Sequence, residues 1–216
     1  MNKKFAVVLS GCGVFDGTEI QEAVMTLYAI KKLGGEYTLF APDMNQYHVV
    51  NHLTGTESEE KRNVFTESAR IARGKIIPLE EFQSSDFDAL IFPGGFGAAK
   101  NLSNFAFRGA DCDVVDSVED AINQMHQSHK PIGALCIAPV LLAKVIKGAN
   151  VTIGNSKKTA NSISEMKGVH TATNQTEIVI DKENKLVTSP CYMLDADIVQ
   201  IQISAENVIN AILELI

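Results

Sequence analysis

Short apolar, β-branched segments alternate along this chain with segments of helical periodicity. Segments typical of strands lie at residues 5–9, 37–41, 88–92, 132–136, 151–154, 177–180 and 186–188. Segments with an apolar helical face lie at residues 19–33, 114–128, 138–146 and 198–216. Consecutive parallel strands need long crossovers, which helices provide. The alternation therefore predicts an α/β sandwich in which helices flank a mostly parallel central sheet.

The composition narrows the class of protein. The 216 residues are 45% hydrophobic and 21% charged, as in an ordinary globular protein, and no linker-like segment divides them, which predicts one domain over residues 1–216. The net charge is −7 and no block of five Lys or Arg occurs, so nucleic acid is not an expected partner. The apolar runs are far shorter than the roughly 18 residues that span a bilayer, so no membrane is expected either.

The N-terminus and the cysteines suggest a reducing compartment. Residues 5–9 are too short for a secretory signal, and we therefore expect a cytoplasmic location. The four cysteines lie far apart with no Cys-x-x-Cys pair, which argues against a zinc site or a redox dithiol. We expect free thiols, no metal and no cofactor.

Cys136 lies where a predicted strand runs directly into a predicted helix. This layout is typical of a nucleophile elbow, in which small residues flank the reactive side chain; Ala134 and Ala138 occupy those positions. The helix start is expected to stabilise a thiolate and to lower the pKa of Cys136. The alternative is a buried structural cysteine.

Groups that could assist such a thiolate follow other predicted strands. The N–H groups of Gly94, Gly95 and Ile137 are candidate oxyanion donors, although the glycines alone would also suit a plain turn. Glu19 and Glu22 lie in the first turn of the first predicted helix. Either is a candidate proton carrier, with a pKa raised by desolvation, or simply complements the helix dipole. Glu22, at the margin of the apolar face, is harder to explain by the dipole alone.

Several further residues are weaker candidates for the same site. Cys12 and Asp16 lie in a glycine-rich loop after the first strand, but the loop lacks the glycine spacing of a dinucleotide site. Lys100 follows the Gly94-Gly95 segment, and His170 is the most plausible distant partner for Cys136. The charged segment 54–73 is typical of a solvated helix or loop, and the alternative is a cover for the active edge or the dimer interface.

Four motifs together resemble a known family. They are Ser10-Gly11-Cys12-Gly13-Val14, Asn51-His52-Leu53-Thr54-Gly55, Pro93-Gly94-Gly95-Phe96-Gly97-Ala98-Ala99-Lys100-Asn101 and Cys136-Ile137-Ala138-Pro139. Over essentially its whole length the chain resembles the PfpI-like branch of the class I glutamine amidotransferase-like superfamily. Within that branch it looks most like the ElbB proteins, also called enhancing lycopene biosynthesis or sigma cross-reacting proteins.

This resemblance implies a flavodoxin-like three-layer sandwich and a homodimer. It also implies a cofactor-independent glyoxalase that converts glyoxal or methylglyoxal to a 2-hydroxy acid, with Cys136 as nucleophile and Glu22 as acid. Ile137 stands where hydrolytic members of the superfamily place a histidine, which argues against amidotransferase or protease activity. The alternative is a non-enzymatic stress- or redox-responsive protein, or an isoprenoid-pathway-associated factor, with an oxidisable Cys136.

Overall fold

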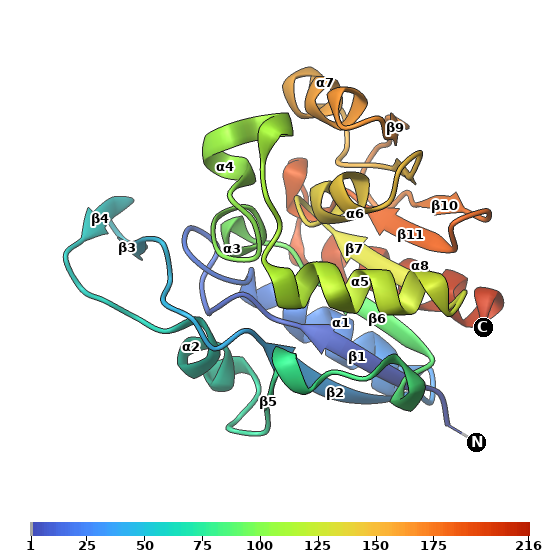
Figure 1. Ribbon diagram of the computed structural model, residues 1–216, viewed down its shortest axis with the longest axis horizontal. Coiled ribbons are helices and arrows are strands. Elements are labelled where there is room, and N and C mark those ends of the chain that lie inside the picture. Colours follow the sequence, from blue (N-terminus) through green and yellow to red (C-terminus); the bar gives the residue numbers. More distant parts are fainter. Residues whose placement is uncertain (1) are drawn as a thin grey trace.

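A seven-stranded sheet runs through the computed structural model, which describes residues 2–216 (Figure 1). Its strands, in spatial order, are β10 (Val179–Asp181), β11 (Leu186–Ser189), β7 (Ile132–Leu135), β6 (Ala89–Phe92), β1 (Lys4–Val8), β2 (Glu36–Ala41) and β5 (Ile77–Pro78). Every neighbouring pair is parallel except β10 and β11. The predicted mostly parallel sheet is confirmed.

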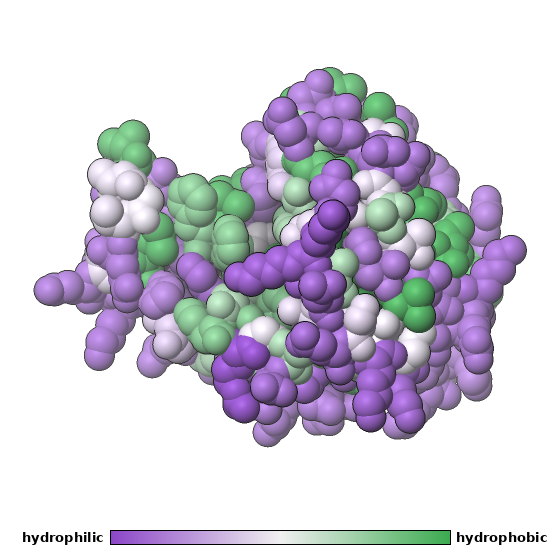
Figure 2. All heavy atoms as spheres, turned by 90° about the horizontal axis from the view of Figure 1, so that it is seen from above, coloured by the Kyte–Doolittle hydropathy of each residue, from purple (hydrophilic) through white to green (hydrophobic). Residues whose placement is uncertain are grey.

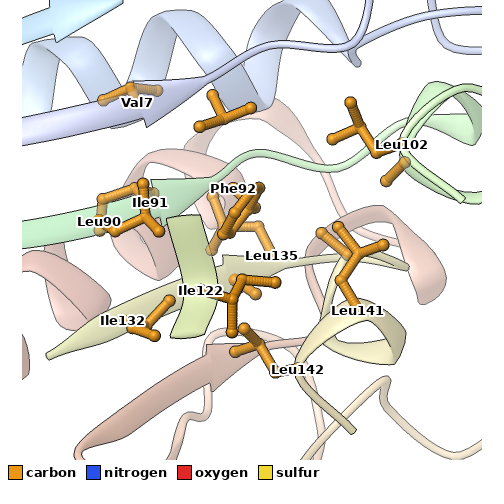
Figure 3. Packing of buried hydrophobic residues seen from close by; sticks show 14 of the residues in the cluster. Val7, Leu90, Ile91, Phe92, Leu102, Ile122, Ile132, Leu135, Leu141 and Leu142 are labelled. Atoms are coloured by element: carbon orange, nitrogen blue, oxygen red, sulfur yellow. The ribbon is translucent and has the colours of Figure 1, made fainter. Parts of the chain in front are cut away.

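Helices cover both faces of this sheet. Helices α1 (Ile20–Lys32) and α8 (Ile198–Leu215) pack against each other on one face, and α5 (Asp116–Gln127) and α6 (Pro139–Val145) cover the other (Figure 1). Figure 3 shows how the α5 and α6 side is filled, with Phe92 and Leu135 of the sheet beside Ile122 of α5 and Leu142 of α6. The structure is the expected flavodoxin-like three-layer sandwich.

The strand order creates a topological switch point at the edge of the sheet formed by the carboxyl ends of the parallel strands. The chain passes from β1 outward to β2 and then returns to form β6 on the other side of β1. Loops that leave neighbouring strands in opposite directions open a crevice at the carboxyl ends of those strands. The segments that follow β1, β6, β7 and β11 are therefore gathered at one place.

Several short elements surround this edge, and the sequence analysis did not predict most of them. They are β3 (Val49–Asn51), β4 (Thr56–Ser58), α2 (Val64–Ile71), α3 (Phe96–Lys100), α4 (Phe105–Arg108), α7 (Lys157–Glu165), β8 (Asn150–Val151) and β9 (Val169–His170). Such lengths show too little periodicity to be recognised. The strand expected at residues 151–154 is instead the short β8, paired with β9 outside the central sheet. The charged segment 54–73 is divided between the β3–β4 hairpin, which projects from the body of the molecule in Figure 1, and α2.

None of the helices within residues 2–216 combines the length and apolar character needed to cross a membrane.

Asn101 joins the segment after β6 to the loop after β1. Its buried side-chain amide donates to the carbonyl oxygens of Ser10 (2.9 Å) and Asp16 (2.8 Å), and its oxygen accepts the Tyr47 N–H (2.9 Å). Three backbone groups, two of them in buried hydrogen bonds, thus depend on one side chain. The amide holds the two loops that border the crevice in a fixed relation.

We expect Asn101→Ala to lower the free energy of unfolding by about 3 kcal/mol, because it leaves buried backbone groups without partners. Urea denaturation measures this change. Asn155→Ala, at an exposed position, is the matched control and is expected to stay within about 0.5 kcal/mol of wild type. Equal stability of the two variants would contradict the assigned role of Asn101.

Candidate active site

Cys136 lies at a sharp turn between β7 and α6. Its backbone φ is +60°, a left-handed conformation that is strained for a residue with a side chain. The strand ends at Leu135, the Cys136 N–H donates to the Ser189 carbonyl oxygen (2.9 Å), and Pro139 is the first residue of α6. Only 6% of the residue is exposed. The strand-to-helix elbow expected from the sequence is present.

The carboxyl of Glu22 is buried beside the sulfur of Cys136. It comes from the first turn of α1, and its two oxygens accept the N–H groups of Gly94 (Oε2, 3.0 Å) and Tyr192 (Oε1, 3.1 Å). It also forms a hydrogen bond with the Cys136 side chain. Burial, with repulsion from Glu19, raises the pKa of Glu22 to about 8, the direction expected for a desolvated carboxyl. Near pH 7 this carboxyl is mainly protonated.

The pKa of the Cys136 thiol is shifted in the direction opposite to the one expected from the sequence. Burial, followed by repulsion from ionised Glu22, raises its pKa well above that of a free cysteine, whereas the helix start was expected to lower it. The N–H groups of Gly95 and Ile137 donate to the sulfur and favour the thiolate, but desolvation outweighs them. The repulsion from Glu22 disappears when that carboxyl is protonated.

Gly94 and Gly95, which follow β6, have different roles, whereas the sequence offered both as oxyanion donors or as plain turn residues. A Cβ on Gly94 would lie 2.3 Å from Cys136 Cβ and 2.4 Å from Glu22 Oε2, so only glycine fits between these two side chains. The Gly94 N–H is taken by Glu22 and is not free to serve as an oxyanion donor. Gly95, at a φ of +99°, directs its N–H toward the sulfur of Cys136 together with that of Ile137.

Glu19 has the structural role that the sequence offered as the alternative for one of the two acids. It is the N-cap of α1, and its Oε2 accepts the Glu22 N–H (2.6 Å). Its own N–H donates to the Gly94 carbonyl oxygen (2.9 Å). Glu19 therefore fixes the turn from which Glu22 reaches the sulfur.

The weaker candidates hold loops in place or lie elsewhere. Asp16 Oδ2 accepts the Val50 N–H (2.7 Å), and Lys100 Nζ donates to a backbone carbonyl of the same glycine-rich loop, that of Phe15 (2.8 Å). The charged neighbours of Cys12 include Glu67 and Arg70 of α2 rather than Glu22. The Nε2 of His170, on β9, accepts the Ile153 N–H (3.4 Å), so this ring is engaged away from Cys136.

Two neighbours of Cys136, Cys191 and Tyr192, lie in a segment after a predicted strand where functional residues are expected, but the sequence assigned neither of them a role. Cys191, in the 3₁₀ turn η4 (Cys191–Met193) after β11, is buried close enough for its charge to raise the pKa of Cys136. Ser189 and Ser204 hydrogen-bond to its sulfur. Tyr192 supplies one of the two N–H groups that hold Glu22. The signal in the sequence was their position, since both residues come two or three positions after β11, a strand that neighbours β7.

A cavity of about 590 Å³ opens beside Cys136. Most of its lining is apolar and comes from α3, α4 and the neighbouring turns: Phe96, Ala99, Phe105, Phe107, Ile137 and Met193. Figure 2 shows hydrophobic side chains gathered between the projecting β3–β4 segment and the body of the molecule. Within residues 2–216 no three His, Cys, Asp or Glu side chains are grouped so as to hold a metal ion.

Burial of Glu22 makes stability depend on pH. The pKa of this acid is about 8 in the folded protein and near 4.5 when solvated, so its ionisation opposes folding. The penalty is absent below pH 4.5, grows through the interval and is complete above pH 8. Between pH 5 and pH 8 we expect Glu22→Gln to gain about 3 kcal/mol of stability relative to wild type. Urea denaturation across this range measures the change, and a constant difference between the two proteins would refute the buried titration.

Two mammalian proteins are similar to this chain over nearly its whole length. The ES1 protein homolog, mitochondrial, of Rattus norvegicus is 46% identical, covering 98% of this chain and 84% of the rat protein. The glutamine amidotransferase-like class 1 domain-containing protein 3, mitochondrial, of Homo sapiens is also 46% identical, with 98% and 83% covered. Both are named as mitochondrial, and this finding corrects the expected cytoplasmic location. That expectation rested on a segment too short for a secretory signal, which bears on secretion only.

A solved structure has the same fold throughout. The isoprenoid biosynthesis protein with amidotransferase-like domain from Ehrlichia chaffeensis superposes with a TM-score of 0.92 at 33% identity. The match covers 99% of this chain and 100% of that one.

A family model matches a part of the chain that contains the residues of the candidate active site. The model described as the DJ-1/PfpI family matches residues 12–193, which contain Glu22, the Gly94-Gly95 segment, Cys136 and Tyr192. The relatives and the solved structure agree with this assignment. The chain belongs to the DJ-1/PfpI family.

Proposed function

We propose that this protein is a cofactor-independent enzyme of the glyoxalase type, which converts a 2-oxoaldehyde to the 2-hydroxy acid. The observation that carries the proposal is the hydrogen-bonded pair of Cys136 and Glu22, a nucleophile and a proton carrier held together out of water. The N–H groups of Gly95 and Ile137 point to the same sulfur. Family membership supports this proposal, because the family includes enzymes.

The pair supplies the groups that the reaction needs. The sulfur of Cys136 attacks the aldehyde carbon, and the new oxyanion is protonated to a hemithioacetal. Glu22 carboxylate removes the C1 proton and returns a proton at C2, so the aldehyde carbon is oxidised as the ketone carbon is reduced. Water then hydrolyses the resulting thioester and releases the 2-hydroxy acid and the thiol. No external oxidant or reductant is consumed.

The resting pair must lose one proton to become active. Below about pH 8 both groups are mainly protonated, and above it the pair carries one negative charge. The Gly95 and Ile137 N–H groups favour placing that charge on the sulfur. The same two N–H groups can stabilise the negative charge when it passes from the sulfur to the substrate oxygen.

The arrangement does not suit amide hydrolysis. Ile137 follows the nucleophile, and His170 is engaged with the backbone of Ile153. An aldehyde is electrophilic enough to react without a histidine to activate the thiol. The human relative's name refers to an amidotransferase-like class of domain, and we extend only that class to this chain.

A redox-responsive role is the second candidate, favoured by Cys191 beside Cys136. Peroxide would oxidise Cys136 to a sulfenic acid and be reduced to water. We also propose membership of the ElbB group, supported by the four sequence motifs and by the name of the Ehrlichia protein. An association with isoprenoid synthesis would follow from that membership rather than from any side chain at the site.

We further propose a homodimer formed through the α1 and α8 layer. Ile20, Val24 and Tyr28 are exposed at four-residue spacing along α1. Val199 and Ile203 repeat this spacing on α8, which packs beside α1. An apolar stripe shared by two adjacent helices suits a self-complementary contact with a second copy.

Cys136→Ala is expected to lower lactate formation from methylglyoxal by at least about 100-fold, because it removes the sulfur that forms the hemithioacetal. Enzymatic determination of lactate measures the rate. Cys12→Ala, a thiol outside the site, is the matched control and should retain wild-type activity. Equal rates for Cys136→Ala and wild type would exclude the proposed function.

Val24→Glu is expected to convert a dimer to a monomer, because it places a charge in the centre of the proposed contact. Sedimentation equilibrium should give twice the mass of one chain for wild type and one chain mass for the variant. Val169→Glu, at a similarly exposed apolar residue on β9, should remain dimeric. A monomeric wild type would rule out the dimer.

A further inference from the structure

We propose that the substrate of the Cys136 site carries an apolar chain of about six carbons on its carbonyl group, rather than the single methyl of methylglyoxal. This inference rests on the proposed function for its reaction, but it is argued from the cavity. Cys136 is one of the residues that line this cavity. A chain attached to the carbonyl group that reacts with its sulfur therefore has to extend into the cavity.

The size of the cavity exceeds what a small dicarbonyl needs. Its volume of about 590 Å³ falls within the range of sites that bind drug-sized ligands. At roughly 30 Å³ for each water molecule, it holds about twenty waters, whereas methylglyoxal displaces only about two or three. A three-carbon substrate would leave most of the cavity hydrated and without contacts.

The lining is matched to an apolar group. Phe105 and Phe107 of α4 face the cavity together with Ile137, the residue next to the nucleophile. Phe107 is also packed against Tyr47, with ring centroids 4.1 Å apart, and this contact helps to hold the Phe107 ring in place. Burying a chain against these rings removes apolar surface from water on both sides.

The lining combines backbone donors beside the sulfur with one charged side chain. The Gly95 and Ile137 N–H groups lie beside the sulfur, where a carbonyl would react. The only charged side chain of the lining, among the residues that the structure describes, is the exposed Lys158 of α7. The donors beside the sulfur and the mostly apolar wall together fit a 2-oxoaldehyde with a medium-length alkyl chain.

Two parallel series test the proposal, one with turnover and one without. The first compares kcat/KM for methylglyoxal with that for 2-oxooctanal, which has five more methylene groups. The second compares the alkylation rates of Cys136 by iodoacetamide and N-hexyl iodoacetamide, each divided by the rate with free cysteine. In that step the sulfur–carbon bond forms as iodide leaves, so it needs no catalytic turnover.

We expect the longer compound to be favoured at least about 30-fold in kcat/KM and at least about tenfold in alkylation. Ser162→Trp, which fills the cavity from α7, should reduce both ratios toward one, as should Phe107→Ala to a lesser extent. Leu53→Ala, at an exposed apolar residue outside the cavity, should keep the wild-type ratios. Mass spectrometry of the iodoacetamide adduct shows whether each variant still presents Cys136.

The two ideas fail in different ways. Turnover of both dicarbonyls with equal kcat/KM, and equal alkylation by both reagents, would overturn the apolar-chain inference while leaving the enzyme proposal intact. Failure to turn over either dicarbonyl, with preferential alkylation by the hexyl reagent, would remove the glyoxalase reaction and support the apolar cavity as a binding site.

Discussion

The buried carboxyl of Glu22 is the group on which the rest of the site depends. It comes from α1, accepts N–H groups that follow β6 and β11, and contacts the sulfur that follows β7. Three strand ends and one helix are therefore held around a single acid. Water is excluded from this point, which raises the pKa of Glu22 to about 8 and makes the acid a proton carrier near neutral pH.

Packing around this carboxyl leaves little room for variation. Gly94 passes between Cys136 and Glu22 with no space for a Cβ, and Glu19 caps the helix so that Glu22 points inward. Cys136 has a left-handed backbone conformation, which is energetically unfavourable for a residue with a side chain. Strain and close approach are both concentrated at the carboxyl edge of the sheet, where the strand order creates a crevice.

The thiol shows how two local effects are weighed in a folded protein. Donors from Gly95 and Ile137, at the start of the segment leading into α6, favour the thiolate. Removal of the sulfur from water has the opposite sign and is larger, because a charge loses much of its solvation when it is buried. A sequence pattern shows that a cysteine lies before a helix, but not how deep that cysteine is. For this reason the expected direction of the Cys136 pKa shift was wrong.

The sequence by itself determined the sandwich fold, the elbow at Cys136 and the choice of Glu19 and Glu22 as candidate acids, because these follow from local periodicity and from residues next to strand ends. Only the tertiary structure decided that Glu22 and not Glu19 meets the sulfur, that Cys191 and Tyr192 join the site, and that His170 does not. These outcomes depend on strand order and on loops between distant segments, which no local pattern encodes. Only the tertiary structure shows the apolar cavity as well. The helices α3, α4 and α7 that enclose it together are too short to be recognised in the sequence.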